Sequence, residues 1–321
     1  MTGRLKQYPP SLQFAAFVGL FLIFTVLYVF FLAFIFPAIS GYSLLTLQSE
    51  LYSAKAAPEP ISPKVLGYLK LTQILYTLVV FLLPAVFFAF LVDTRPANWM
   101  RIDRKPRFLP IILAFLIMLV AIPFVSYTGD WNHTWPFSPE LRKVEEQAEI
   151  LTRALLIMPD ISSLLINLFM IAIIPAIAEE FFFRGIVQRL LIKMIPQMPW
   201  LCVFIAAACF SAIHMQWMDF IPRLLLGFLL GAIYYLSGNL WLSILGHFLN
   251  NGLQVVMVYL YQVKMIETDP MTSTPTEWYI AALSLALTIG AIWLFDKRTM
   301  PGEREHNHRD DFNDNIESIG K

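Results

Sequence analysis

The chain has 321 residues, of which 58% are hydrophobic, 15% are aromatic and only 14% are charged. This composition excludes an ordinary soluble globular protein. The formal net charge is zero, so no long-range field attracts a polyanion, and nucleic acid is not an expected partner.

Apolar residues form blocks of about 20, the length of a helix that crosses a bilayer. Eight spans are predicted, at residues 12–37, 69–92, 109–128, from 163 onward, 200–214, 220–236, 240–261 and 278–295. The predicted fold is therefore an all-α, polytopic membrane bundle of about eight transmembrane helices, surrounded by lipid. Residues 1–296 are expected to form one membrane-embedded domain, and the polar segment 297–321 is expected to be a disordered tail.

Orientation in the membrane follows from lysine and arginine in the loops, because basic loops stay on the cytoplasmic side. The loop after the second span is the richest and contains Arg95, Arg101, Arg104, Lys105 and Arg107. With eight spans, this loop lies on the same side as both ends of the chain. The protein is thus predicted to be a multi-pass protein of the cell membrane with cytoplasmic N- and C-termini.

Between the third and fourth spans, residues 139–155 place Leu141, Val144, Ala148, Leu151 and Leu155 on one face of a helix and charges on the other. One interpretation is an interfacial helix that guards a lateral entrance. The other, which we favour, is a loop helix that covers exposed span ends.

The fourth span contains two adjacent carboxylates, Glu179 and Glu180, followed by Arg184. Ionisable groups are expensive inside a membrane and are functional candidates by default. Glu180 and Arg184 are four residues apart, share a helix face and can pair. Glu179 is rotated by about 100° and can point elsewhere, as a general base would. The alternative is a buried ion pair that only holds the helix in place.

Two further polar pairs lie on later spans. Phe210 and His214 are four residues apart on the fifth span, where a single histidine is more often an interface or core residue than a catalyst. His247 and Asn251 share a face of the seventh span. Both can donate hydrogen bonds to an oxyanion, or they can join helices through interhelical hydrogen bonds.

Together, Glu179, His214, His247 and Asn251 are the groups needed to activate water and to stabilise a tetrahedral oxyanion. Glu179, His214 and His247 are also acceptable zinc ligands. On the sixth span, Gly227 and Gly231 are expected to allow close helix packing.

The three motifs, Glu-Glu-x-x-x-Arg, Phe-x-x-x-His and His-x-x-x-Asn in this order, resemble those of the CPBP family of intramembrane proteases (CAAX protease and bacteriocin-processing, also called ABI), which includes the type II CAAX prenyl endopeptidases. The resemblance covers about residues 160–260. It implies that Glu179 and His214 activate water, that His247 and Asn251 bind the oxyanion, and that Glu180, Arg184 and Phe210 orient the site. The family has been described both as metalloproteases and as metal-free glutamate proteases.

The predicted function is an intramembrane endopeptidase that acts on a peptide or membrane-protein substrate, of a membrane-associated or prenylated type. No cofactor is expected to be required, because Glu179 and Asn251 can serve without an ion, although zinc stays open. The alternative is a non-catalytic membrane scaffold or immunity factor of the same fold. An ion-coupled transporter is a third class, but no inverted repeat of broken helices supports it.

Overall fold

The computed structural model describes residues 3–56, 61–272 and 275–299. Within these residues every regular element is a helix, which confirms the all-α prediction. The first part of the chain forms α1 (Pro10–Phe30), α2 (Phe36–Ser40), α3 (Leu44–Ala56), α4 (Pro63–Tyr76), α5 (Leu83–Val92), α6 (Pro96–Trp99), α7 (Phe108–His133) and α8 (Pro139–Leu155). The second part forms α9 (Ile161–Asn167), α10 (Ile174–Glu180), α11 (Arg189–Met194), α12 (Pro199–Ala212), α13 (Phe220–Ser237), α14 (Leu240–Gln262) and α15 (Trp278–Arg298).

In the described part of the chain, four π-helical segments join α-helices into longer continuous helices, namely η1 (Phe31–Ile35), η2 (Thr77–Leu82), η3 (Leu168–Ile173) and η4 (Phe181–Gln188). A proline stands two residues after each of the first three, at Pro37, Pro84 and Pro175. Proline has no N–H and its ring clashes with the carbonyl four residues earlier, so the preceding turn has to widen. These prolines therefore account for three of the four π segments.

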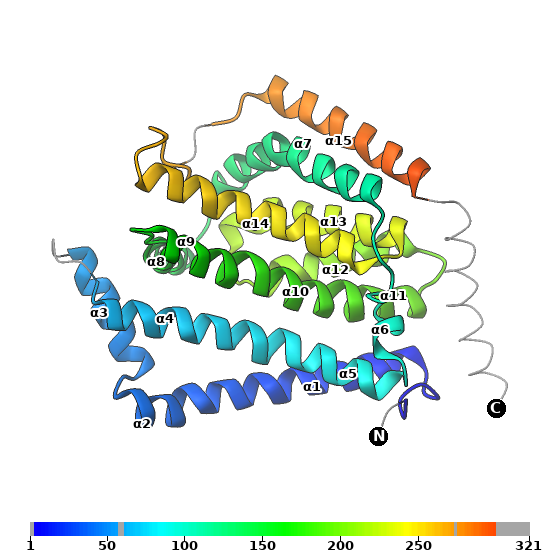
Figure 1. Cartoon of the computed structure of the whole chain (residues 1–321), viewed down its shortest axis with the longest axis horizontal. Coiled ribbons are helices and arrows are strands. Elements are labelled where there is room, and N and C mark those ends of the chain that lie inside the picture. Colours follow the sequence, from blue (N-terminus) through cyan, green and yellow to red (C-terminus); the bar gives the residue numbers. More distant parts are fainter. Residues whose placement is uncertain (1–2, 57–60, 273–274, 300–321) are drawn as a thin grey trace.

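The long helices run along one common direction and pack side by side (Figure 1). Six continuous helices of the described chain are long and apolar enough to cross a membrane: Pro10–Ser40, Pro63–Val92, Phe108–His133, Ile161–Met194, Trp217–Ser237 and Trp278–Arg298. The other two predicted spans correspond to α12, which is shorter, and to α14, which is long but carries several polar side chains. The protein is an integral membrane protein with a polytopic helical bundle.

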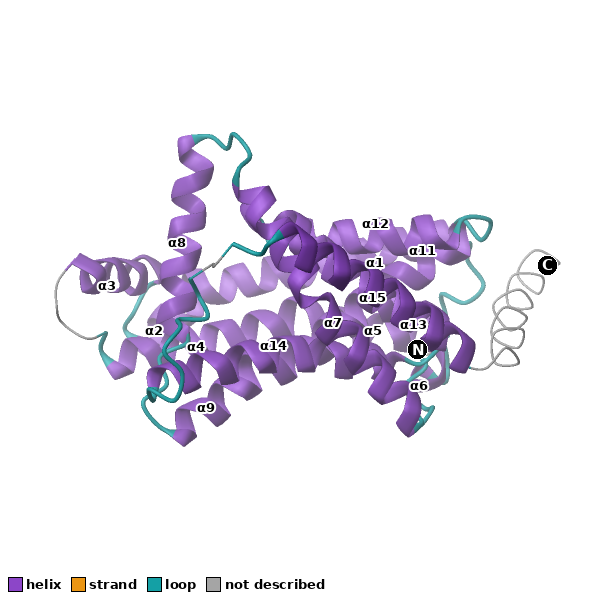
Figure 2. Ribbon diagram, turned by 90° about the horizontal axis from the view of Figure 1, so that it is seen from above, coloured by secondary structure: helices purple, strands orange, loops and turns teal. Residues whose placement is uncertain are grey.

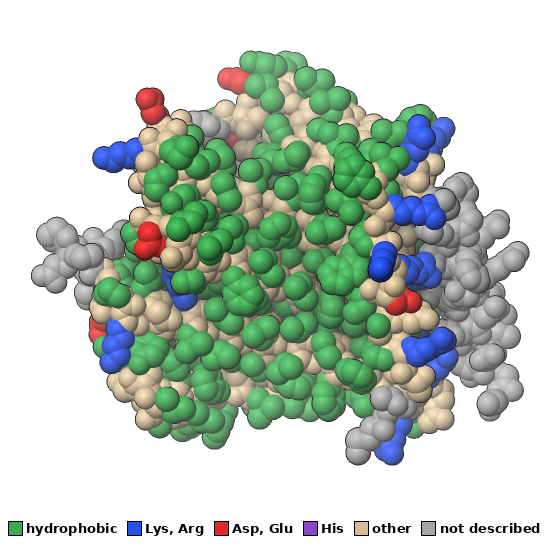
Figure 3. Space-filling view, in the orientation of Figure 1, with side chains coloured by type: hydrophobic (Ala, Val, Ile, Leu, Met, Phe, Trp, Pro, Cys, Tyr) green, Lys and Arg blue, Asp and Glu red, His purple; other side chains and the backbone are tan. Residues whose placement is uncertain are grey.

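The outer surface agrees with a membrane environment. Large apolar side chains such as Val26, Phe34, Leu283 and Ile289 are more than half exposed. Apolar side chains cover the middle of the face seen in Figure 3, and charged side chains gather toward its two ends. A water-soluble protein rarely exposes an apolar area of this extent. Lipid is therefore the natural surrounding of the bundle.

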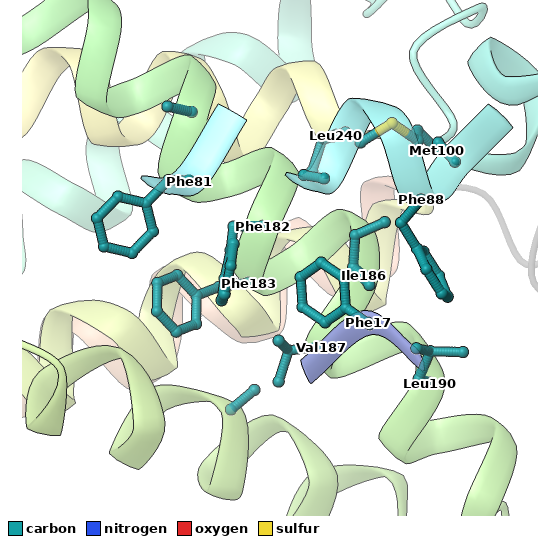
Figure 4. Packing of buried hydrophobic residues seen from close by; sticks show 14 of the residues in the cluster. Phe17, Phe81, Phe88, Met100, Phe182, Phe183, Ile186, Val187, Leu190 and Leu240 are labelled. Atoms are coloured by element: carbon teal, nitrogen blue, oxygen red, sulfur yellow. The ribbon is translucent and has the colours of Figure 1, made fainter. Parts of the chain in front are cut away.

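The largest hydrophobic core forms around the phenylalanines that follow the two glutamates. Phe182 and Phe183 on η4 are buried, and the Phe182 ring lies 4.8 Å from the ring of Phe17 and 5.3 Å from that of Phe81 (Figure 4). The Phe183 ring packs at 5.2 Å against Phe210 of α12. These rings connect the N-terminal helices to the segment that carries Glu179, Glu180 and Arg184.

Helix α8 has the bounds predicted for the amphipathic segment 139–155. It runs across the ends of the long helices instead of along them (Figure 2). Its last residues, Ala154 and Leu155, pack in one cluster with Leu47 and Leu51 of α3 and with neighbouring side chains of α4. The C-terminal end of α8 thus covers span ends, whereas Val144, on its predicted apolar face, is 48% exposed.

Some boundaries differ from the prediction. Helix α12 ends at Ala212, so His214 lies just beyond the helix and not on it. The helix before Val92 begins at Pro63, several residues earlier than predicted, and α3 was not anticipated. Helix α15 includes Lys297 and Arg298, the first residues of the expected tail. From residue 300 onward, that tail lies outside the described residues.

Candidate active site

The centre of the site is a completely buried ion pair. Glu180 closes α10 and is 0% exposed, while Arg184 on η4 is 1% exposed. Oε1 of Glu180 and Nη1 of Arg184 are 2.9 Å apart, as the i, i+4 spacing predicts. A second nitrogen of Arg184 donates to the carbonyl oxygen of Gly227 at 2.8 Å. Because a buried charge needs such partners, the pair holds η4 against α13.

Glu180 also reaches across to α14. Its Oε1 lies 2.9 Å from Nδ1 of His247, and its Oε2 accepts a hydrogen bond from the Ser243 hydroxyl at 2.5 Å. A carboxylate can only accept, so the His247 ring donates from Nδ1 and keeps Nε2 for another partner. Glu180 therefore does more than the predicted pairing with Arg184, because it also orients His247.

Glu179 faces away from that pair, as predicted from the rotation between neighbouring helical residues. Its side chain is largely buried, and its Oε2 lies 3.9 Å from Nε2 of His247. Glu179 is also within electrostatic range of His214, Tyr76 and Arg223. The two adjacent acids thus have separate surroundings: one is paired with Arg184, His247 and Ser243, and the other has His247 at 3.9 Å and His214 within electrostatic range.

Phe210 separates the two histidines and contacts both. Its ring centroid is 5.0 Å from the ring of His214 and 6.1 Å from that of His247. The Arg184 guanidinium lies 4.9 Å from the same ring centroid. Nδ1 of His214 is 2.7 Å from the backbone carbonyl oxygen of Phe210, so His214 donates there and its Nε2 is not used by this bond. Phe210 is placed to fix both imidazoles.

Asn251 lies one helical turn beyond His247 and bonds to a different element. Its side-chain Nδ2 donates to the carbonyl oxygen of Ile171 on η3 at 3.0 Å, and its Oδ1 accepts from Asn250 at 3.1 Å. In a regular helix, the Ile171 carbonyl would accept the N–H of residue 175, but that residue is Pro175. Asn251 therefore supplies the donor that proline removes. This is the interhelical bond that the alternative interpretation predicts, and it leaves the second amide N–H of Asn251 for another acceptor.

We expect Asn251→Leu to lower the free energy of unfolding by about 1–3 kcal/mol, since the Ile171 carbonyl then has no donor in apolar surroundings. Adding Pro175→Ala should restore part of that loss, because alanine returns the backbone N–H. Pro84→Ala, which follows η2, is the matched control and should restore nothing. Thermal unfolding in detergent micelles measures all four proteins. Equal rescue by both alanine substitutions would contradict this assignment.

Small residues on α13 allow polar side chains of η4 to reach its backbone. Gln188 donates to the carbonyl oxygen of Gly231 at 3.0 Å, four residues after the matching bond of Arg184 to Gly227. A Cβ atom at Gly231 would lie 2.8 Å from Oε1 of Gln188, and one at Gly227 would lie 3.0 Å from the Phe210 ring. Close packing at this glycine pair is as predicted, and the two side-chain bonds are an additional finding.

Ser243 is a site residue that the motifs did not reveal. It is fully buried. Its hydroxyl lies 2.5 Å from Oε2 of Glu180 and 3.0 Å from the carbonyl oxygen of Leu230. The signal was present in the sequence, because Ser243 stands four residues before His247 on the same helix face. Gln188 on η4 could have been found in the same way, four residues after Arg184.

We expect Ser243→Ala to lower the free energy of unfolding by about 1–3 kcal/mol, because a carboxylate in a dry site loses one donor. Ser237→Ala is the control: that hydroxyl is also buried, but it bonds backbone groups at the end of its own helix, the Ile233 carbonyl oxygen and the N–H of Asn239, and its removal should have a smaller effect. Thermal unfolding of the two variants checks this. An equal loss in both would show that Ser243 does not support Glu180.

Glu179, His214 and His247 carry oxygen and nitrogen atoms of the kind that bind zinc. Among the described residues, no three His, Cys, Asp or Glu side chains converge as a metal-binding group. Oε2 of Glu179 and Nε2 of His247 are 3.9 Å apart, slightly more than the separation of about 3.3–3.6 Å between two ligands of one tetrahedral zinc.

The comparison with family models identifies the same region as the motifs. Residues 161–253 match the model described as type II CAAX prenyl endopeptidase Rce1-like. The match runs from the start of α9 to beyond Asn251 on α14, so it includes all three motifs. Comparisons with curated proteins and with solved structures give no significant match. Residues 161–253 are therefore similar to the type II CAAX prenyl endopeptidase family, as the three motifs predict.

Proposed function

We propose that the protein is an intramembrane endopeptidase that hydrolyses a peptide bond with water activated by Glu179 and His214. One observation carries the proposal: Glu180 orients His247 so that Nε2 of the ring lies 3.9 Å from Glu179, within a largely buried site. A fully paired acid beside a second, largely buried acid with an imidazole at 3.9 Å is difficult to explain as packing alone, because each buried ionisable group opposes folding in a membrane.

In the proposed reaction, water binds between Glu179 and His214. Glu179 accepts a proton as the water oxygen forms a bond with the carbonyl carbon of the substrate. The carbonyl oxygen gains negative charge and accepts hydrogen bonds from protonated His247 and from the second amide N–H of Asn251. The carbon–nitrogen bond then breaks, and the proton taken from water passes to the leaving amine.

The charges around the site support this assignment of roles. Glu180 and Arg184 compensate each other at 2.9 Å. His247 lies between the carboxylates of Glu180 and Glu179, at 2.9 Å and 3.9 Å. Donors that are already oriented need no rearrangement when the oxyanion forms. This preorganisation accounts for most of the transition-state stabilisation that such a site provides.

We propose a membrane-associated substrate that carries a prenyl or similar apolar group. Support comes from the exposed apolar belt of the bundle and from the prenyl endopeptidase description of the matching family. We also propose that both termini are cytoplasmic. The start of α1, the end of α15, α6 and α11 lie at one end of the bundle (Figure 1), and α6 belongs to the arginine-rich loop.

The test is cleavage by the purified protein in lipid vesicles. The probe is a peptide that ends in the CAAX pattern and carries a farnesylated cysteine, with products identified by mass spectrometry. We expect the farnesylated peptide to be cleaved and the same peptide without the prenyl group to be cleaved much more slowly. Absence of cleavage of the farnesylated peptide, in vesicles where the protein is folded, would contradict the proposal.

A metal-free reaction is part of the proposal. We expect prolonged chelation to leave the cleavage rate unchanged, because proton transfer and oxyanion binding are assigned to Glu179, His214, His247 and Asn251. The measurement is the rate in vesicles before chelation, after chelation, and after return of zinc. Loss of activity on chelation that zinc alone restores would show that these residues hold a metal during the reaction.

A further inference from the structure

Arg223 is a cation beside the proposed active site that the reaction as described does not use. It lies in the first turn of α13, and its side chain is 20% exposed. Its guanidinium is within electrostatic range of both Glu179 and His214. Its nearest polar partners belong to the segment between α12 and α13: one nitrogen is 2.9 Å from the side-chain oxygen of Gln216, and another is 3.5 Å from the Gln216 carbonyl oxygen.

The positive charge of Arg223 is only loosely compensated. The nearest carboxylate oxygen within the described chain, on Asp219, is 4.0 Å away, and Asp219 is also 3.1 Å from His133. Glu145 is within electrostatic range, but its Oε1 accepts the backbone N–H of Met218. Moreover, a cation in the first turn of a helix faces the positive end of the helix dipole, which is unfavourable. Helix stability therefore does not explain an arginine at this position.

We infer that Arg223 binds a carboxylate of the substrate while the neighbouring peptide bond lies between Glu179 and His214. This inference rests on the proposed function and names a further recognition element of the substrate. The planar guanidinium fits a carboxylate through two parallel hydrogen bonds. A peptide can present such a group in two ways, as its carboxyl terminus or as an acidic side chain near the cleaved bond.

A purely structural role predicts a different behaviour. Arg223 could hold Gln216 and Asp219, and with them the turn that follows His214. Loss of Arg223 would then weaken the binding of every peptide to the same degree. A carboxylate-binding role instead makes the effect depend on the substrate, because only a peptide with a carboxylate can lose the contact.

The experiment measures peptide binding to Glu179→Gln protein in nanodiscs, so that binding is followed without cleavage. Three farnesylated probe peptides are compared: one ends in a free carboxylate, one ends in a carboxamide, and one ends in a carboxamide but carries glutamate as its last side chain. Each is titrated against Glu179→Gln alone and against Glu179→Gln combined with Arg223→Gln, Arg223→Lys or Arg153→Gln. Arg153 is the matched control, since it pairs with Glu149 on its own helix α8 and with Asp269 in the loop that follows α14.

With Arg223 present, we expect the carboxamide peptide to bind about 10- to 100-fold more weakly than the carboxylate peptide, as loss of a charged hydrogen bond requires. Arg223→Gln should abolish this preference, Arg223→Lys should retain part of it, and Arg153→Gln should leave it intact. Recovery of binding by the glutamate peptide would show that Arg223 also accepts a side-chain carboxylate, and no recovery would show that it accepts only the terminal one.

Equal binding of the peptides with and without a carboxylate would overturn the inference, as would a preference that survives Arg223→Gln or a failure to bind any of the probes. These results are separate from the test of the proposed function. Failure of wild-type protein to cleave the farnesylated peptide contradicts the protease assignment, whereas loss of the carboxylate preference contradicts only the role of Arg223.

Discussion

Glu179→Gln is expected to lower kcat for peptide cleavage by about 10²- to 10⁴-fold, the contribution typical of a general base. Glutamine keeps the shape and polarity of the side chain but cannot accept the proton of the attacking water. The neighbouring Glu180 cannot substitute, because Arg184, His247 and Ser243 already occupy its carboxylate. The measurement is the initial rate in vesicles, together with thermal unfolding to show that the fold is kept.

Glu149→Gln is the matched control for that experiment. Glu149 lies on α8, is 57% exposed and pairs with Arg153, so its replacement should leave kcat unchanged. Turnover by the Glu179 variant at the rate of the Glu149 variant would show that Glu179 is not the base. Loss of folding in the Glu179 variant alone would indicate that the carboxylate is structural.

The second large effect concerns stability. Arg184→Ala should lower the free energy of unfolding by about 3–5 kcal/mol, because it leaves the buried carboxylate of Glu180 without its main compensating charge. It also removes the hydrogen bond to Gly227 and the contact with Phe210. Arg153→Ala is the control: this arginine is 41% exposed, and exposed ion pairs contribute no more than about 1 kcal/mol. Thermal unfolding in detergent compares the two.

A double variant separates stability from catalysis. Replacing both partners, with Glu180→Gln and Arg184→Met, should restore much of the stability lost in Arg184→Ala, because no uncompensated charge stays buried. It should nevertheless remain inactive, since His247 has lost the carboxylate that orients its ring. A stable double variant that cleaves the peptide normally would show that the buried pair is structural only.

The bundle could be predicted from the sequence because apolar length and helical spacing are local properties. Blocks of about 20 apolar residues gave the spans, and i, i+4 spacing gave the pairing of Glu180 with Arg184. The same spacing separated the roles of the two glutamates. Helix α3 was missed because it is not an apolar block, and His214 was placed on a helix because hydropathy does not mark where α12 ends.

Contacts between helices could not be predicted, because spacing along one helix does not tell which neighbour its polar face meets. The bond between Glu180 and His247 joins α10 to α14. Asn251 on α14 donates to the Ile171 carbonyl oxygen, which lacks its usual helical donor because residue 175 is proline. Arg223 belongs to none of the three motifs, yet it lies within electrostatic range of Glu179. These relations depend on helix rotation and depth, which the packing of the whole bundle decides.

The central claim is that water held by Glu179 attacks the peptide bond directly. A single turnover of wild-type protein in water labelled with oxygen-18 tests it most directly, with the new carboxyl terminus analysed by mass spectrometry. Direct attack predicts that every product molecule of the first turnover carries one labelled oxygen. A first turnover that yields unlabelled product would show that an oxygen of the protein had been transferred, and would contradict the role assigned to Glu179.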